Sequence, residues 1–570
     1  MTRIYGFILA ILSALTSTSA TEAQTDSHQC RCMPTDPCWP SQQEWIAFNK
    51  TVQGNLIATV PIASACHDST FGPYDEAKCD ALKVIWGYPE TYIASPSQPM
   101  YPFFANLSCD PFTSPDAHCI VGTLVQYTVN ATSTSHIKTT ISFAQRKNIR
   151  LVIRNTGHDY NGKSAYAPGG LALWTHHMKD MHILDYHSNI YKGKALKVGA
   201  GISGEEAQNL AHARGLVVVT GNCPTVGITG GYAQGGGHSP VSSKFSLAAD
   251  QVLEWEVITS TGKHLIATPD RYPDLYWALS GGGGGTYGIV VSITIRAHAD
   301  LPTSAAKLAF SNHGVSNDTF YEGVKMYLMA MPNIVDAGAV SVLFLTEGKL
   351  QMEPVTAPGV SKADLQKILD AMLTTLKNLG ITYDFHIDEF PTYLDCYEAY
   401  TPRANISENN TESRLIPQTM LSNNASVSAI TDVFRYVVTH GGLVIGVSLN
   451  VFDGAKVPNS VHPLWRLANT HTVLGIPYDL LDFQNNIDAN ERLLNDFMPR
   501  LDAVLPVQAA YLNEADASEP DWQNVFYGSN YNILKSIKNK YDPSSTWYGQ
   551  TAVGSDDWAF DHHTGRLCRV

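Results

Sequence analysis

The sequence has few charged residues and no cluster of basic ones. Asp, Glu, Lys and Arg make up only 16% of the 570 residues, and 52 acidic residues against 38 basic ones give a net charge of −14. A nucleic-acid-binding surface needs clustered Lys and Arg, so the composition argues against such a partner. Internal repeats and low-complexity tracts are also missing, and 44% hydrophobic residues indicate a globular protein with an ample core.

Long apolar runs are missing after the N-terminus. The first 20 residues combine Arg3, an apolar run from Ile4 to Leu15 and small residues before Ala20, which is the pattern of a signal peptide cleaved after Ala20 or Ala23. A membrane anchor is the weaker alternative, because the run is too short to span a bilayer. We therefore expect a soluble protein of the secretory pathway, secreted or in a vacuolar lumen, with no membrane partner.

Zinc-type C-x-x-C pairs are absent, although the chain has ten cysteines. We therefore expect no metal site. In an oxidising compartment the N-terminal cluster predicts a disulfide framework, whose pairing the sequence does not determine. The cluster contains Cys30, Cys32, Cys38, Cys66, Cys79, Cys109 and Cys119, and the others are Cys223, Cys396 and Cys568. N-x-[ST] sequons predict N-glycans at Asn49, Asn106, Asn130, Asn317, Asn405, Asn409 and Asn424.

The chain divides by its patterns into segments. Residues 21–118 are rich in cysteine and proline, and we expect an irregular extension stapled onto the next domain. Residues 119–300 are expected to form one α+β domain, residues 301–510 a second domain with a mixed sheet, and residues 511–570 a C-terminal segment. In this last segment "NILKSIKNKY" predicts a helix that stops at Asp542-Pro543.

Periodicity within the α+β domain predicts its elements. "LVQYTVN", "STSHIKTTISFAQRKN" and "IRLVIR" predict a strand, a helix and a strand, a β-α-β unit. "LKVGAGISGEEAQNLAHARGLVVV" predicts a strand and a helix, with Ser203 and Glu206 as a capping box and Gly215 as the terminating glycine. "DQVLEWEVITSTGKHLIA" predicts a hairpin.

Two glycine-rich stretches lack the signatures of common nucleotide sites. "GNCPTVGITGGYAQGGGHS" (residues 221–239) has seven glycines but no P-loop lysine, so its main chain approaches some other ligand closely. "SGGGGGTYGIVVSITIR" contains G-x-G-x-x-G at Gly283, Gly285 and Gly288, yet an alternating strand pattern follows instead of a helix. The Rossmann interpretation therefore fails, and a glycine turn packed against a ligand remains.

His158 and Cys223 are candidate chemical groups, each with a structural alternative. His158 follows a strand in "RNTGHDY", where backbone N–H groups and Arg154 can bind a pyrophosphate, or it is a structural turn histidine. Cys223 is a covalent nucleophile, a small buried thiol or half of a disulfide. A protease-like pair of Cys223 with His158 or His238 is disfavoured, because no orienting partner is evident.

Four motifs in order resemble one family, the berberine-bridge-enzyme-like flavin oxidases of the vanillyl-alcohol-oxidase superfamily. They are "RNTGHDYNGKS", "GNCPTVGITGGYAQGGGHS", "GGGGGTYGIVVSITIR" and "YGSNYNILKSIKNKYDP". "CRCMPTDPCWP" and "AVGSDDW" look most like the secreted fungal branch. The resemblance implies an α+β fold: a PCMH-type FAD-binding domain, a substrate domain with a mixed or antiparallel sheet covered by helices, and a C-terminal segment that returns to the FAD domain.

The resemblance also implies how FAD is held. By this resemblance, the flavin 8α-methyl group is bonded to His158 and ring carbon C6 is bonded to Cys223. The two bonds raise the reduction potential of the flavin. Residues Arg154 to Gly157 would face the pyrophosphate, and Asn530 and Tyr531 match an Asn-Tyr pair near the flavin. The full set of other cofactor-binding residues implied is Arg154, Asn155, Thr156, Gly157, Asp159, Gly227, Gly230, Gly231, Gly235, Gly236, Gly237, His238, Ile289, Asn530 and Tyr531.

The implied activity is an oxidase acting on an alcohol or C–H group of a small molecule, such as an intermediate of fungal secondary metabolism. Val226 matches the family's oxygen gate, so O2 is the expected acceptor and H2O2 the product. Tyr160, with a lowered pKa, is the expected catalytic base, and Tyr397, Tyr400 and Asp395 are further candidates. The alternatives are a carbohydrate oxidase and a secreted glycoprotein that keeps the fold without the chemistry.

Overall fold

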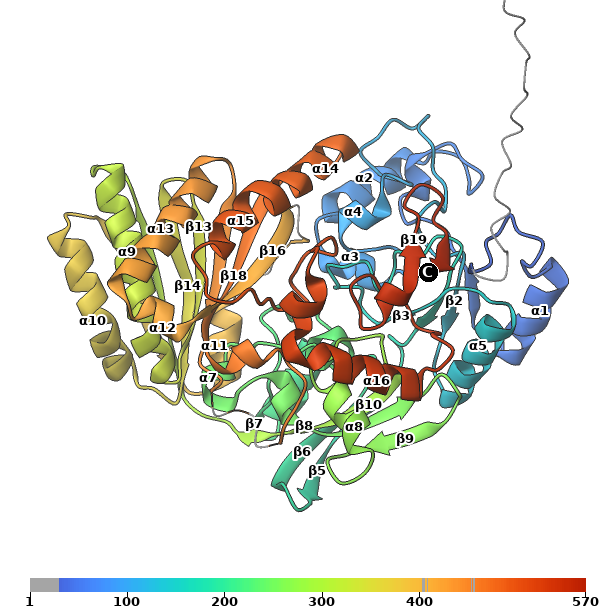
Figure 1. The fold of residues 1–570 in the computed structure, drawn as a ribbon, viewed down its shortest axis with the longest axis horizontal. Helices are drawn as coiled ribbons and strands as arrows, with labels where there is room; N and C mark the ends of the chain where they lie inside the picture. The colour runs from blue at the N-terminus through green and yellow to red at the C-terminus, as the bar shows by residue number, and fades with distance from the viewer. Residues whose placement is uncertain (1–29, 402–404, 407–408, 453, 455–456) are drawn as a thin grey trace, which may run out of the picture.

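The computed structural model describes residues 30–401, 405–406, 409–452, 454 and 457–570, so the predicted signal peptide lies outside the described residues. Figure 1 shows two regions: a sheet with stacked helices formed by the yellow and orange part of the chain, and a second region built from its blue, green and red parts. None of the helices in the described part has the length and apolarity needed to span a bilayer.

A four-stranded sheet with the order β1-β2-β4-β3 begins the second region. Its strands are β1 (Leu56–Ala58), β2 (Tyr127–Asn130), β3 (Leu151–Arg154) and β4 (Leu171–Trp174). β2 and β3 both run parallel to β4, and helix α5 (Thr134–Arg146) joins β2 to β3. The Ser133 hydroxyl caps α5 by accepting a hydrogen bond from the His136 N–H, which confirms the predicted β-α-β unit.

The cysteine-rich segment is built into this sheet. Its strand β1 pairs with β2, and helix α1 (Gln42–Thr51) stacks the ring of Phe48 on Phe143 of α5, with centroids 4.0 Å apart. The prediction of an irregular extension is therefore wrong, because periodic apolar residues such as Trp45 and Phe48 need burial against the domain that follows. The segment also contains α2 (Glu76–Ile85), α3 (Pro89–Ile93) and α4 (Pro102–Ala105).

A five-stranded antiparallel sheet lies next along the chain, in the order β5-β6-β10-β8-β9. Its strands are β5 (Met181–His187), β6 (Lys192–Gly199), β8 (Val252–Ile258), β9 (His264–Ala267) and β10 (Ile289–Arg296). Helix α6 (Gly204–His212) carries the predicted Ser203–Glu206 capping box, and β8 and β9 form the predicted hairpin. Also present are α7 (Ser242–Phe245), α8 (Pro273–Leu279) and the pair β7 (Leu216–Val217) and β11 (His298–Ala299).

The other region is a seven-stranded sheet covered by helices. Its strands, in the order β15-β12-β14-β13-β17-β18-β16, are all paired antiparallel, so the sheet is not mixed. They are β12 (Thr303–Ser311), β13 (Val340–Thr346), β14 (Lys349–Pro358), β15 (Tyr383–Phe390), β16 (Asn409–Pro417), β17 (Leu443–Ser448) and β18 (Ala468–Pro477).

Helices cover one face of this sheet, as Figure 1 shows for α9 (Asn317–Asp336), α10 (Lys362–Asn378) and α13 (Asn424–Thr439). Leu365, Leu369 and Leu376 recur at helical spacing along α10, so a single stripe of the helix is buried against the sheet. The remaining helices here are α11 (Tyr393–Tyr400), α12 (Gln418–Leu421), α14 (Phe483–Arg492) and α15 (Met498–Asp502).

The C-terminal segment returns to the first region. Helix α16 (Tyr531–Tyr541) and the hairpin of β19 (Trp558–Phe560) and β20 (Leu567–Arg569) lie beside the blue and green elements in Figure 1. A disulfide between Cys30 and Cys568 ties the two ends together, and the other pairs are Cys32–Cys38, Cys66–Cys79 and Cys109–Cys119. Cys223 and Cys396 are free.

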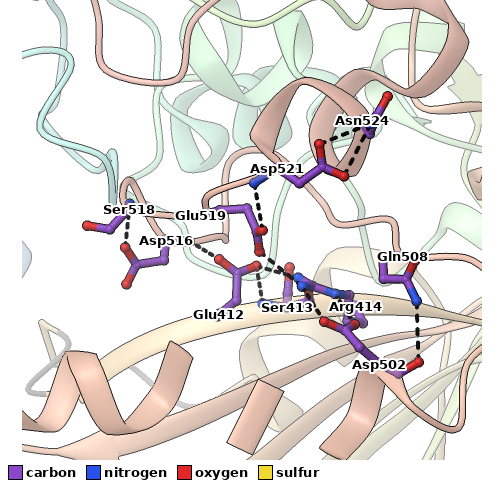
Figure 2. A network of polar contacts seen from close by, with 10 residues as sticks. All are labelled: Glu412, Ser413, Arg414, Asp502, Gln508, Asp516, Ser518, Glu519, Asp521 and Asn524. Atoms are coloured by element: carbon purple, nitrogen blue, oxygen red, sulfur yellow. Dashed lines mark hydrogen bonds and ion pairs between the residues drawn. The ribbon is translucent and has the colours of Figure 1, made fainter. Parts of the chain in front are cut away.

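A polar network joins strand β16 to the C-terminal segment (Figure 2). Arg414, whose side chain is 3% exposed, makes a two-pronged contact with Asp502 at 2.7 and 2.9 Å and also bonds Glu412 and Glu519. Glu412 in turn accepts a hydrogen bond of 2.6 Å from the backbone N–H of Asp516. This network fixes the path of the chain immediately after residues 511–514.

The Asp516 carboxyl makes the stability of this network pH-dependent. Burial raises its pKa from 3.8 to about 6, against the opposing hydrogen bonds from Ser518. Between about pH 4 and pH 6 the native protein therefore keeps a proton on Asp516 that the unfolded chain has released, so the contribution of Asp516 to the free energy of unfolding falls as pH rises through this window and is constant above it. In Asp516→Asn, which stays uncharged, we expect this fall to disappear.

Urea midpoints at about pH 4.5, 5.5 and 6.5 measure the effect. Asp521→Asn is the matched control, since Asp521 is an exposed carboxylate of the same segment, and it should keep the wild-type slope. An unchanged slope in Asp516→Asn would show that another group causes the pH dependence.

Candidate functional site

A cavity of about 390 Å³ is lined mainly by five segments. Its walls come from the loop after β3, the glycine-rich stretch after β7, the turn before β10, the segment that follows β18 and α15, and the chain after α16. The lining residues of these segments fall within 155–164, 221–238, 284–290, 511–514 and 547–549. The predicted residues that line it are Asn155, Thr156, Gly157, His158, Asp159, Tyr160, Cys223, Val226, Gly227, Gly230, Gly231 and His238.

His158 and Cys223 meet at one hydroxyl group. The Thr225 Oγ1 lies 2.8 Å from His158 Nε2 and 3.2 Å from Cys223 Sγ, although the two side chains are 65 residues apart in sequence. Both side chains line the cavity. The turn after β3 and the loop after β7 therefore bring an imidazole and a thiol to the same end of the cavity.

The His158 imidazole is neutral at physiological pH. Burial lowers its pKa from 6.5 to about 4, and the nearby Arg154 charge acts in the same direction. A neutral imidazole keeps a lone pair on one ring nitrogen and can act as a nucleophile, which a protonated one cannot. The site therefore presents two uncommitted nucleophiles, the His158 ring and the free Cys223 thiol.

Arg154 does not face the cavity, which corrects the pyrophosphate assignment. Its guanidinium is fully buried and donates hydrogen bonds to the backbone carbonyls of Ser95 at 3.1 Å and Tyr92 at 2.9 Å. It thus anchors the cysteine-rich segment to β3. Gly157 is needed beside it, because its φ is +84° and a Cβ there would lie 2.6 Å from the Arg154 guanidinium.

Lys163 supplies the positive charge that Arg154 does not. Among the described residues that line the cavity, Lys163 is the only lysine, and no arginine is present. Burial lowers its pKa from 10.5 to about 8, partly offset by the charge of Asp159. Asp159 itself accepts hydrogen bonds from the backbone N–H groups of Lys163 and Ser164, so its carboxylate closes the loop.

Several other predicted residues lie outside the cavity wall. Gly235, Gly236 and Gly237 allow tight packing, since a Cβ on Gly237 would lie 2.8 Å from that of Ala248. Strand alternation turns Ile289 into the core, while its neighbours Gly288 and Val290 line the cavity.

Asn530 and Tyr531 are also removed from the cavity. Asn530 donates to the carbonyls of Ser460 and Val461, each at 3.2 Å, and Tyr531 donates to Asp556. Both side chains therefore hold the C-terminal segment in place.

The expectation for the Tyr160 phenol is wrong in direction. Burial is the main cause that raises the pKa of Tyr160, and electrostatic interactions with Glu514 and Cys223 act in the same direction. The phenol therefore stays protonated at neutral pH. Tyr160 lines the cavity as a hydrogen-bond donor and not as a ready base.

The three further base candidates lie off the cavity wall. Tyr397 donates to the backbone carbonyl of Asn222 at 2.6 Å, beside Cys223. Tyr400 bonds Asp388, and Asp395 bonds Thr392 at the start of α11. None of the three lines the cavity described here.

The cavity walls fit FAD in chemistry and shape. Buried polar atoms without a partner among the described residues point to a polar ligand: Asn155 Nδ2 and Oδ1, Asn161 Oδ1, Asn222 Oδ1 and Gln234 Oε1. Gly230 and Gly285 line the cavity, and a Cβ on either would meet no atom within 4 Å, so the main chain there leaves room for a ligand to lie against it. A flat, polar-edged cofactor with an anionic diphosphate suits this cradle, with Lys163 as its cation.

Comparison with known proteins identifies the class. The family model for an FAD binding domain matches residues 125–268, and the model "Berberine and berberine like" matches residues 510–554. These two spans contribute four of the five wall segments described above, and the turn before β10 lies outside both. The protein is thus an FAD-linked oxidoreductase.

Similarity extends over the full chain. The FAD-linked oxidoreductase sor8 of Hypocrea jecorina (strain QM6a) is 43% identical over 100% of this chain and 99% of its own. The VAO-type flavoprotein oxidase VAO615 of Thermothelomyces thermophilus is 40% identical over 97% and 98%. The crystal structure of the VAO-type flavoprotein MtVAO615 from Myceliophthora thermophila C1 superposes with a TM-score of 0.91 at 40% identity, over 95% of this chain and 100% of that one.

The chain therefore belongs to the berberine-bridge-enzyme-like FAD-linked oxidoreductases of the vanillyl-alcohol-oxidase superfamily. This confirms the predicted family and fold class and the prediction that the protein is an enzyme that uses FAD.

Sequence reasoning missed four residues of the site. Thr225 lies in the quoted glycine-rich stretch, and its place two residues after Cys223 was the available signal. Lys163 lies in the quoted G-K-S run. Glu514 and His471 belong to segments with no motif, and only the fold places Glu514 at the cavity wall and His471 against it.

Proposed function

We propose that the protein is an oxidase that removes a hydride from an alcohol or activated C–H group of a small molecule and uses O2 as acceptor, producing H2O2. We propose further that its FAD is attached twice, through His158 and through Cys223. The observation that supports this is the convergence of a neutral imidazole and a free thiol on the Thr225 hydroxyl in a cavity that fits FAD.

FAD, when bound, supplies the hydride acceptor and the reactivity toward O2. The chain's own residues do the rest. His158 and Cys223 hold one end of the cofactor, and Lys163 neutralises diphosphate charge. The protonated Tyr160 donates a hydrogen bond to a substrate oxygen. The name of the relative VAO615 includes "oxidase", which favours O2 as acceptor here.

A substrate panel tests the activity. Aliphatic and aromatic alcohols and oligosaccharides are incubated with the holoenzyme, and H2O2 is followed with a peroxidase-coupled dye. Peroxide from alcohols supports the proposal, whereas peroxide only from oligosaccharides assigns the carbohydrate-oxidase alternative. Anaerobic bleaching of the flavin by a panel compound without peroxide in air contradicts O2 as the acceptor.

Val226 provides a prediction that needs no substrate. Its side chain lines the cavity beside the Cys223 loop. In Val226→Leu the larger side chain narrows the route of O2, and we expect reoxidation of dithionite-reduced enzyme to slow by on the order of tenfold or more, about 1.4 kcal/mol of barrier. Stopped-flow mixing with aerated buffer measures the rate. Val226→Ala is the control and should reoxidise at least as fast as wild type; equal rates in all three forms would remove Val226 from this role.

We also infer passage through the secretory pathway, the division of the chain at residues 119, 301 and 511, and N-glycans at the sequons. Four disulfides suit an oxidising compartment. All seven sequon asparagines are exposed or partly exposed, so glycans fit the folded surface. Digestion with peptide N-glycosidase of protein from a eukaryotic host should lower its mass.

A further inference from the structure

Three distant segments meet on one carboxylate at the cavity wall. Glu514 comes from the C-terminal segment, His238 from the end of the glycine-rich stretch and His471 from β18 of the seven-stranded sheet. His238 Nε2 lies 3.0 Å from Glu514 Oε1, and His471 Nε2 lies 2.8 Å from Glu514 Oε2. Each imidazole thus has its own oxygen of the same carboxylate.

The carboxylate determines the protonation of both rings. Burial acts to raise the pKa of Glu514, but the charge near His238 and the hydrogen bonds from both imidazoles outweigh it, and the net effect lowers the pKa. An ionised carboxylate only accepts hydrogen bonds, so each ring must carry its proton on Nε2. Burial also lowers the pKa of His471 and favours its neutral form. The cluster therefore holds an ionised carboxylate between two imidazole N–H donors, of which His471 is neutral.

Glu514 is the accessible part of this cluster. Its side chain is 30% exposed and lines the cavity, whereas His471 is fully buried and His238 is 10% exposed. A carboxylate has about four acceptor positions. The two imidazoles use one on each oxygen, and the rest are available to a ligand in the cavity.

One atom each of His238, His471 and Glu514 lie within 4.8 Å of one another, a spacing that a metal ion could use. The hydrogen-bonding geometry nevertheless favours a hydrogen-bonded cluster over a metal site. A metal-bound imidazole almost always donates its second N–H to a carbonyl or carboxylate. Here the Nδ1 atoms of His238 and His471 are buried without a hydrogen-bond partner among the described residues, so neither position suits an N–H group.

We propose that Glu514 is a substrate-binding and specificity-determining residue, whose carboxylate accepts a hydrogen bond from an O–H or N–H group of the substrate, and that His238 and His471 position it. The site then selects hydroxyl-bearing or cationic molecules and rejects carboxylates. This proposal rests on the proposed function only in placing the substrate in the FAD cavity.

Three neutral tyrosines lie close enough to Glu514 for its charge to affect their pKa values. Tyr160 from the loop after β3, Tyr232 from the glycine-rich stretch and Tyr511 from the same segment all have raised pKa values, chiefly through burial and also through the Glu514 charge. The Tyr511 hydroxyl accepts hydrogen bonds from Gly237 N and Asn513 Nδ2. These phenols are protonated, and Lys163, with a pKa of about 8, stays charged at lower pH. Below about pH 8 the charge around Glu514 therefore depends on Glu514 itself and on the two histidines.

Three probes of one shape and different charge test the specificity. Benzylamine, benzyl alcohol and benzoate are titrated into the holoenzyme, and the change in flavin absorbance gives each Kd. We expect benzylamine and benzyl alcohol to bind more tightly than benzoate. A hydrogen bond to a charged group contributes about 1.5–3 kcal/mol, so Glu514→Gln should weaken benzylamine binding by roughly 10- to 100-fold and reduce the preference over benzoate.

His471 variants test positioning without altering the cavity surface. His471→Phe removes one donor to the carboxylate, which raises the pKa of Glu514. The carboxylate also loses one of the two groups that orient it, so benzylamine binding at pH 7 should weaken by roughly 10-fold, the effect of one hydrogen bond. His471→Gln keeps an N–H donor and should restore most of the wild-type affinity. His264→Gln removes a histidine that bonds Glu256 on the surface at 2.8 Å and should change nothing.

Three results would overturn the proposal: equal binding of benzylamine and benzoate, no weaker binding of any probe by Glu514→Gln, or a stoichiometric metal ion in the purified holoenzyme by plasma mass spectrometry. None of these measurements depends on turnover or peroxide, so their failure is distinct from failure of the proposed oxidase activity.

Discussion

Acid precipitation of the wild-type holoenzyme is expected to leave all of the yellow colour in the protein pellet, and His158→Ala/Cys223→Ala to release it into the supernatant. The reason is that the two proposed bonds are independent. Each single variant should keep its flavin through the remaining residue, because the imidazole and the thiol approach the cavity from different loops. Only loss of both nucleophiles leaves FAD held by noncovalent contacts, which acid destroys.

Thiol counting on the same samples tells which bonds exist. The chain has ten cysteines, of which eight are paired, leaving Cys223 and Cys396. Denatured but unreduced wild type should therefore titrate a single thiol, that of Cys396, if the Cys223 sulfur carries flavin. Cys396→Ala is the control: it should keep a yellow pellet and titrate none. Two thiols in wild type, or a yellow pellet from the double variant, would contradict double attachment.

Replacement of Arg414 by methionine is expected to cause the second large effect, a loss of about 3–5 kcal/mol in the free energy of unfolding. Arg414 is the cation among Glu412, Asp502 and Glu519 (Figure 2), and both Glu412 and Glu519 are buried. Removal of one partner of a buried ion pair leaves uncompensated charge in a medium of low polarity, which methionine cannot relieve. Urea midpoints with fluorescence detection measure the change.

The surface pair Arg435–Asp318 is the matched control for this experiment. Its N–O distance of 2.7 Å equals that of Arg414–Asp502, but the Asp318 side chain is 84% exposed. Exposed pairs contribute at most about 1 kcal/mol, so Arg435→Met should shift the midpoint little. Similar midpoints for the two variants would show that burial of Arg414 has no energetic consequence.

Local patterns predicted the elements of the FAD region well, because short-range physics determines them. The Ser203–Glu206 capping box, the strand-helix-strand order around α5 and the β8–β9 hairpin all follow from caps and periodicity within a few residues. The irregular character assigned to residues 21–118 was wrong, since its periodicity becomes stable only against α5 and β2.

Site residues could be predicted from the sequence where they lie in a recognisable motif, and not elsewhere. His158 and Cys223 follow from quoted motifs, and the structure brings them to one hydroxyl. Side-chain direction was the common source of error. Arg154 and Ile289 are in the expected stretches, but a strand sends alternate side chains to opposite faces, and both point away from the cavity.

The amino-acid sequence by itself determined the family, the two candidate nucleophiles and the local elements, since these depend on residue types at fixed spacings. Only the tertiary structure decided which groups share the cavity and in what charge state. Glu514 reaches the cavity from a segment without a motif, the fully buried His471 bonds Glu514 from another such segment, and burial sets the protonation of His158 and Tyr160. The physical reason is that desolvation and charge proximity act through space, between residues hundreds of positions apart.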